Sequence, residues 1–243
     1  MIDVPVRFAL LPLLLAQAAY LRATVLQLPE PDGPRSGVVG QGAPLRLLII
    51  GDSSAAGVGV AHQHDALLGQ LTARLSEDAE ITFDLVARTG ARTGDVLAWL
   101  DDLPHRHYDV VVTALGVNDV TKAVPLRKWI ARQRALIARL QGAFGVKHVM
   151  LSGLPPMGQF PLLPQPLRWI LGRQAARFDA ALCDIARETQ GCTKIAIDLA
   201  LGPHNMSADG FHPGPAVYAA WAAEIQTQLR ARTTLLDGGQ GNT

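Results

Sequence analysis

A largely apolar run, residues 45–50 (Leu-Arg-Leu-Leu-Ile-Ile), ends abruptly in Gly51-Asp52-Ser53-Ser54. A short apolar run of this kind is typical of a buried parallel strand. Open α/β sheets bind their ligands at the carboxyl ends of such strands, which is where Ser53 would lie. Because many strand-to-helix loops favour Gly, Asp and Ser, the run alone predicts only a strand and a turn. It indicates a reactive serine only if partner residues follow at other strand ends.

Strands and helices alternate along the rest of the chain. We expect strands at 45–50, 81–86, 110–115, 146–151 and 194–198, and helices at 65–75, 95–100, 126–144, 174–188 and 216–229. Alternation of this kind implies right-handed crossovers and a parallel sheet with helices on both faces. The sequence therefore predicts an α/β fold, a flavodoxin-like three-layer α/β/α sandwich with a five-stranded parallel sheet.

The distribution of proline and glycine predicts one domain with a segment before it and a short tail after it. Pro31, Gly33, Pro34, Gly37, Gly40 and Gly42 crowd the stretch before the first strand, and such residues mark loops. We expect an apolar N-terminal segment at 1–28, a linker at 29–44, one globular domain at 45–232 and a flexible tail at 233–243.

The N-terminal segment allows three interpretations. Residues 8–21 are almost entirely apolar, yet they are few for a membrane span. Arg7 before them and Ala16-Gln17-Ala18 within them resemble a signal peptide or short anchor, whereas Asp3 and the apolar stretch 23–28 argue against cleavage. A helix on the membrane surface and a helix packed on the protein are the alternatives. Membrane association and an exported or membrane-associated location, periplasmic if bacterial, are therefore expectations, with a cytoplasmic location as the alternative.

Composition narrows the function classes. Hydrophobic residues make up 49% of the 243 residues and charged residues 18%, which excludes a disordered chain. A formal net charge of +1 and the lack of basic runs argue against a nucleic-acid partner. Cys183 and Cys192 lack metal or redox spacing; they are either independent or paired by a disulfide. Since His62-Gln63-His64 and His105-Arg106-His107 have no clustered carboxylates, we expect neither a metal nor a cofactor.

A serine nucleophile needs a base and a group that orients the base. His212 lies just before the last predicted helix, and Asp209 stands three residues earlier in the same loop. This spacing can place the carboxylate against the imidazole Nδ1–H, so that Nε2 faces the serine. A histidine before a proline is also common in ordinary loops, so Asp209 and His212 indicate a catalytic pair only in combination with Ser53.

Donors for a developing oxyanion can come from two further strand ends. Asn118 directly follows the strand at 110–115, and its side-chain amide can donate to an oxyanion. Gly90 follows the second strand, and a glycine lets the backbone N–H approach a ligand closely. Each residue alone is equally compatible with a turn.

Taken together, these residues resemble the SGNH hydrolase superfamily of GDSL-type esterases and lipases. The resemblance covers about residues 45–232 and rests on Gly51-Asp52-Ser53-Ser54 with Gly57, Gly90, Gly116-Val117-Asn118-Asp119 and Asp209-Gly210-Phe211-His212. It implies a Ser53, Asp209 and His212 catalytic triad, and an oxyanion hole formed by Ser53, Gly90 and Asn118. Ser54 stands where many members have leucine.

A loop after the fourth strand is the candidate acyl site. Residues 153–164 are rich in proline, and Met157, Phe160 and Leu162 can line a pocket or simply pack on neighbouring helices. The sequence thus predicts a serine hydrolase that forms an acyl-enzyme with a small ester substrate, either a short- to medium-chain or an aryl carboxylic ester. The alternatives are a carbohydrate O-deacetylase, a lysophospholipase or a non-catalytic binding protein of the same fold. The oligomeric state is left open.

Overall fold

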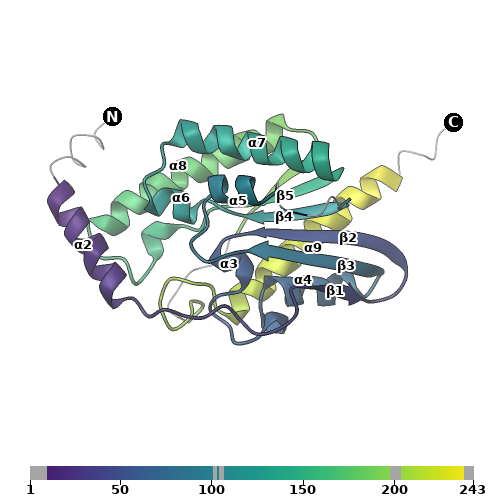
Figure 1. The fold of residues 1–243 in the computed structure, drawn as a ribbon, viewed down its shortest axis with the longest axis horizontal. Coiled ribbons are helices and arrows are strands. Elements are labelled where there is room, and N and C mark those ends of the chain that lie inside the picture. Colours follow the sequence, from purple (N-terminus) through teal and green to yellow (C-terminus); the bar gives the residue numbers. More distant parts are fainter. Residues whose placement is uncertain (1–9, 101–102, 104–106, 198–203, 238–243) are drawn as a thin grey trace.

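A single mixed sheet runs through the part of the chain that the computed structural model describes, residues 10–100, 103, 107–197 and 204–237. Its six strands lie in the order β1-β3-β2-β4-β5-β6 (Figure 1). The strands are β1 (Ser36–Val39), β2 (Ala43–Gly51), β3 (Ala79–Ala87), β4 (Val110–Ala114), β5 (His148–Ser152) and β6 (Cys192–Ile195). Neighbours from β3 to β6 are parallel, and β1 pairs antiparallel with β3. The parallel part has the predicted flavodoxin-like order.

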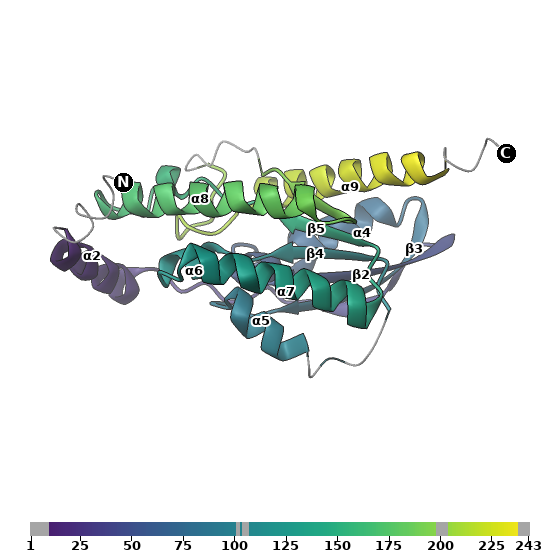
Figure 2. The same ribbon diagram turned by 90° about the horizontal axis from the view of Figure 1, so that it is seen from above.

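Helices cover both faces of the sheet, as the α/β/α prediction requires (Figures 1 and 2). Helices α5, α7 and α8 contribute buried side chains to the core on one face, and α4 and α9 contribute most of the helical core on the other. The helices are α2 (Leu11–Thr24), α3 (Ser53–Ala56), α4 (Leu67–Leu75), α5 (Thr93–Trp99), α6 (Val117–Thr121), α7 (Leu126–Phe144), α8 (Leu167–Glu188) and α9 (Pro215–Asp237). Short 3₁₀ turns at Gln63–Asp65 and Met157–Gln159 interrupt the loops.

Strand β2 lies at the centre and shows why the chain folds in layers. Its side chains alternate between the two faces: Leu47 and Ile49 pack toward α4 and α9, whereas Leu48 and Ile50 pack toward α7 and α8. All four are fully buried. A strand apolar on both faces must be covered on both, so the sequence that begins the domain also sets its three-layer architecture.

The expected five-stranded, wholly parallel sheet is wrong in one respect. Residues 36–39, assigned above to the linker, form β1 and pair with β3 from Ser36↔Asp84 to Val39↔Ile81. The glycines and prolines around this segment indicated a loop, and four residues are too few to show a periodicity of their own. The free edge of β3 supplies the partner that the local sequence cannot reveal. Strand β6 also begins two residues earlier than expected.

Helices α2 and α9 lie toward the two ends of the chain. Helix α9 continues to Asp237, past the predicted domain end at Arg232, and residues 238–243 of the expected tail lie outside the described residues. Helix α2 occupies part of the apolar N-terminal segment and buries none of its residues. Its attachment combines packing of Leu21 against the core with two hydrogen bonds of Gln17. Gln17 donates from Nε2 to the carbonyl of Gln165 at 2.6 Å and accepts from the N–H of Leu167 at 3.3 Å.

Candidate active site

Ser53 lies where the strand order of the sheet reverses. Strand β2 is flanked by β3 and β4, and Ser53 begins the short helix α3 directly after it. Gly51 is required at the strand end, because a Cβ there would lie 2.4 Å from the carbonyl oxygen of Ala114. The Asp52 side chain caps α3 by accepting from the N–H of Ser54 at 3.0 Å. The serine is thereby held at the edge where open α/β sheets bind ligands.

His212 and Asp209 reach Ser53 from a loop 159 residues later in the chain. Nε2 of His212 lies 2.9 Å from Oγ of Ser53, and its Nδ1 lies 2.5 Å from Oδ2 of Asp209. The side chain of His212 is 16% exposed and that of Asp209 is fully buried. Hydroxyl, imidazole and carboxylate therefore stand in series, with only the first two open to the cavity.

Asp209 is kept ionised by its surroundings. Burial alone would raise its pKa, but hydrogen bonds outweigh this effect and hold the pKa well below its usual range. Its Oδ1 accepts from Oγ of Ser207 at 2.7 Å and from the N–H groups of Phe211 and His212 at 2.9 Å each. These bonds fix the carboxylate so that Oδ2 faces Nδ1, which selects the tautomer with a free Nε2 lone pair.

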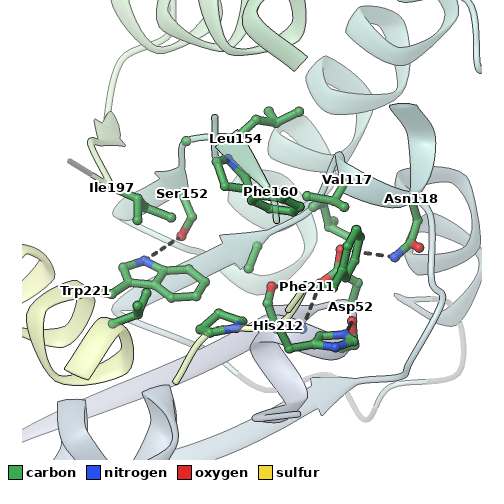
Figure 3. A pocket seen from close by; sticks show the side chains of 18 of the residues that line it. Asp52, Val117, Asn118, Ser152, Leu154, Phe160, Ile197, Phe211, His212 and Trp221 are labelled. Atoms are coloured by element: carbon green, nitrogen blue, oxygen red, sulfur yellow. Dashed lines mark hydrogen bonds between the residues drawn. The ribbon is translucent and has the colours of Figure 1, made fainter. Parts of the chain in front are cut away.

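Asn118 reaches the same cavity from α6, the helix after β4. Its Nδ2 donates to Oδ2 of Asp52 at 3.2 Å (Figure 3). Asp52 is 3% exposed, and this burial raises the pKa of its carboxyl despite the opposing hydrogen bonds from Ser54. One amide N–H of Asn118 thus donates to a buried carboxyl, and its second N–H can donate to another acceptor.

An apolar cavity extends from Ser53 beneath the β5–α8 loop. At its far end from His212, Nε1 of Trp221 donates to Oγ of Ser152 at 3.2 Å (Figure 3). Phe211 packs edge-on against both Phe160 and His212, with ring centroids 5.2 and 5.3 Å apart. The remaining apolar lining consists of Ala114, Leu115, Val117, Leu154, Pro155, Ile197, Met206, Pro213 and Val217.

The remaining predicted residues are divided between this cavity and other places. Phe160 lines the cavity, whereas Met157 is fully buried in the core and does not line it. Leu162 lies beside Gly210, 3.6 Å from where a Cβ on that glycine would be. Gly90 has a positive φ of 82° and lines a separate hollow with Arg88 and Trp99. The structure thus gathers the three polar triad residues, Asn118 and Phe160, but not Met157, Leu162 or Gly90.

Sequence reasoning missed several contributors to the site. Asp52 was assigned only to the turn, although its position before Ser53 is that of a helix N-cap. Ser207, two residues before Asp209, also escaped notice, although short Ser-x-Asp spacings favour local hydrogen bonds. Trp221 and Ser152 gave no local signal, because only the packing of α9 on β5 brings them together.

No group of three or more potential metal-binding side chains occurs among the residues that the structure describes. Cys183 and Cys192, for which a disulfide was one option, are unbonded. The polar groups that the site presents are the Ser53 hydroxyl, the His212 imidazole, the Asp209 and Asp52 carboxyls and the Asn118 amide.

A serine hydroxyl, an imidazole and a buried carboxylate in series are the arrangement of serine hydrolases, carried here on a flavodoxin-like α/β/α sandwich. Residues 49–220, well over half of the chain, match the model of the GDSL-like lipase/acylhydrolase family. The chain belongs to this family, as the sequence resemblance implied, and is a carboxylic ester hydrolase.

Solved structures share this fold. The esterase EstA from Pseudoalteromonas sp. is 22% identical with a TM-score of 0.60, over 78% of this chain and 98% of that one. Axe2, an acetylxylan esterase from Geobacillus stearothermophilus, is 21% identical with a TM-score of 0.56, over 77% of this chain and 94% of that one. No curated protein matches the sequence significantly. At such identities the likeness shows the shared fold.

Proposed function

We propose that Ser53 is the nucleophile of a two-step ester hydrolysis. Oγ of Ser53 attacks the ester carbonyl carbon while Nε2 of His212 takes its proton. The tetrahedral intermediate collapses, the alcohol leaves with the proton from His212, and the acyl group stays on Ser53. Water then gives a proton to His212 and attacks the acyl carbon. The second tetrahedral intermediate collapses, His212 returns the proton to Oγ of Ser53, and the acid is released. The 2.9 Å contact between Ser53 and His212 is the observation that carries this proposal.

The negative charge on the carbonyl oxygen needs preorganised donors. The donors we propose are the amide N–H of Asn118 that Asp52 does not occupy and the backbone N–H of Ser53 at the start of α3. Gly90 is the third proposed donor. It follows β3, the strand next to β2, but it does not line the cavity, so its contribution would require the β3–α5 loop to approach the bound substrate.

The substrate we propose is a short- to medium-chain or aryl carboxylic ester. The cavity walls are mostly apolar, and among the residues that line it no arginine or lysine is available to bind a charged acyl group. Trp221 and Ser152 close its far end, which favours acyl groups of limited length. A carbohydrate O-deacetylase is the second candidate, supported by the cavity end at Trp221 and Ser152 and by the fold shared with an acetylxylan esterase.

Hydrolysis of a p-nitrophenyl acyl series, C2 to C10, tests this proposal. Wild type is expected to hydrolyse the shorter members, Ser53→Ala to lose at least about 10³-fold in kcat, and the matched variant Ser54→Ala to keep most of the activity. A phosphonate probe should label Ser53. Inactivity of folded wild type on this series and on acetylated xylan would refute the proposal, as would labelling of Ser54 in place of Ser53.

A further inference from the structure

We propose that α2 and the first turns of α8 form a surface that docks on an anionic lipid bilayer. The surface consists of Leu11, Leu13, Leu15, Tyr20 and Leu26 around α2 together with Trp169 on α8. The docking itself is independent of the catalytic mechanism proposed above. Only its consequence, that the ester arrives from the lipid phase, rests on that proposed function.

Exposed large apolar side chains concentrate on this surface. Within the described part of the chain, six of the eight are the residues just named, with exposures from 39% at Trp169 to 66% at Tyr20. The other two, Val38 and Val39, lie on the edge strand β1. Single exposed apolar residues are ordinary, but six of them on one helix, the residues after it and the start of a neighbouring helix indicate an interaction site.

The helix carries apolar residues on all sides, and a helix of this kind is normally buried either in a protein core or in a membrane. A helix that packs on protein presents one apolar stripe and a polar back. Helix α2 instead buries no residue and carries no charged side chain before Arg22. Its fixed contacts are the two hydrogen bonds of Gln17 to the start of α8, together with packing of Leu21 on the core.

The charges around the surface indicate that the bilayer is anionic. Residues 10–29 and 153–178 contain no aspartate or glutamate, whereas they contain Arg22, Arg168, Arg173 and Arg177. The whole chain, by comparison, has a formal net charge of only +1. The Arg173 guanidinium lies over the exposed Trp169 ring, 5.4 Å from its centroid. Aromatic rings and cations beside an apolar helix suit the headgroup region of anionic lipids.

The position of α2 ties the surface to the active site. Both views show α2 beside the beginning of α8, at the end of the sheet that carries α3 and α6 (Figures 1 and 2). The β5–α8 loop connects them, since Phe160 lines the cavity and Gln165 bonds to Gln17. A bilayer docked there would face the cavity side of the enzyme. The inferred substrate is therefore an amphiphilic ester that partitions into lipid.

The length of α2 fits a helix that lies on the bilayer. Its 14 residues extend about 21 Å, against about 30 Å of hydrocarbon core. Among the described residues, no helix has the combined length and hydropathy needed to cross a bilayer.

Flotation of the full-length protein with phosphatidylglycerol vesicles tests the proposal. Wild type and Ser53→Ala should both float, and binding to phosphatidylcholine vesicles should be weaker. The triple variant Leu13→Ser, Leu15→Ser and Tyr20→Ser should bind at least about tenfold more weakly. The matched variant Val38→Ser with Val39→Ser, which removes the other exposed apolar pair, should bind as wild type does. Hydrolysis of a water-soluble p-nitrophenyl ester should be unchanged in both multiple variants.

Several outcomes would overturn the docking surface. These are wild type that does not float, a triple variant that floats equally well, and a protein recovered from cells with its N-terminus beyond Ala18. Dimerisation in the absence of lipid, lost in the triple variant, would assign the surface to a second copy of the chain. Because flotation needs no catalysis, failure of the proposed hydrolysis would show separately, as inactivity on the soluble ester.

Discussion

Asn118 donates a hydrogen bond from Nδ2 to Oδ2 of Asp52 across 3.2 Å, joining the ends of two adjacent strands. The second carboxylate oxygen of Asp52 accepts from both the N–H and the Oγ of Ser54, at 3.0 and 2.8 Å. Both oxygens of this buried side chain are therefore engaged, which holds the amide of Asn118 in one orientation. Asp52 is thus a positioning residue for the proposed oxyanion donor.

We expect Asp52→Asn to lower kcat about tenfold to a hundredfold with little change in KM. Its amide oxygen can still accept from Ser54, so its Nδ2 would face Nδ2 of Asn118. Two donors repel, and Asn118 must rotate away from the oxyanion; removing an oxyanion donor outright costs about 10²–10³ in kcat. Steady-state kinetics on a p-nitrophenyl ester, with thermal unfolding to check the fold, measures the effect.

A double-mutant cycle shows whether Asp52 acts through Asn118. If it does, Asp52→Asn should reduce kcat much less in an Asn118→Ala background than in wild type. Equal losses in both backgrounds would contradict the positioning role. Ser54→Ala is the matched control, because it removes one bond to Asp52 and leaves the contact with Asn118 in place.

Asp209→Asn should lower kcat by about 10³–10⁴ while leaving KM nearly unchanged. An amide in place of the carboxylate cannot stabilise the imidazolium and can favour the wrong His212 tautomer. Ser207→Ala removes one of the four hydrogen bonds to Asp209 and should cost far less. A kcat for Asp209→Asn within tenfold of wild type would argue that another group orients His212.

The layered fold could be predicted because the sequence patterns that indicate its strands and helices are local. The apolar runs of β2 and β4 and the periodic helix α7 are visible in short windows, and their alternation sets the parallel topology. Strand β1 could not be predicted, since it exists only through pairing with β3. Helix α8 begins at Leu167, seven residues before its expected start, because Leu167 and Ile170 are fixed by burial in the core rather than by a capping sequence.

The polar site was predictable for a related reason. Ser53 and Asn118 follow strands, and the ends of neighbouring parallel strands must meet at one edge. No comparable rule predicts which loop residues line the cavity. Met157 and Phe160 are three residues apart in one loop, yet the first, which begins a 3₁₀ turn, faces the core, whereas the second, directly after the turn, faces the cavity. Trp221 enters the site only through tertiary packing.

The two carboxyl groups of the site should affect stability in opposite ways as pH changes. The lowered pKa of Asp209 stabilises the folded protein above the unfolded pKa of about 3.9, and this stabilisation is lost as pH falls below it. The raised pKa of Asp52 means that the folded state retains its proton longer, so its contribution decreases as pH rises above about 3.9.

Unfolding in urea between pH 3 and pH 7 would measure this contrast. Relative to wild type, Asp209→Asn should become less stable as pH rises, whereas Asp52→Asn should recover stability over the range between about 3.9 and its raised pKa. Parallel pH profiles for the two variants would contradict the opposite pKa shifts.

Trp221→Leu should shift the preferred acyl chain toward longer esters. The indole is 3% exposed, stacks on Tyr218 and closes the cavity by bonding to Ser152, so a smaller side chain deepens the cavity. We expect the ratio of kcat/KM for octanoate over butyrate to rise at least about tenfold, since room for about two more buried methylenes, at about 0.8 kcal/mol each, is worth about 1.6 kcal/mol. Trp129→Leu is the matched control, because Trp129 is fully buried in the core and does not line the cavity. Both variants should be destabilised, but only Trp221→Leu should change the ratio; an unchanged ratio there would place the acyl chain outside this cavity.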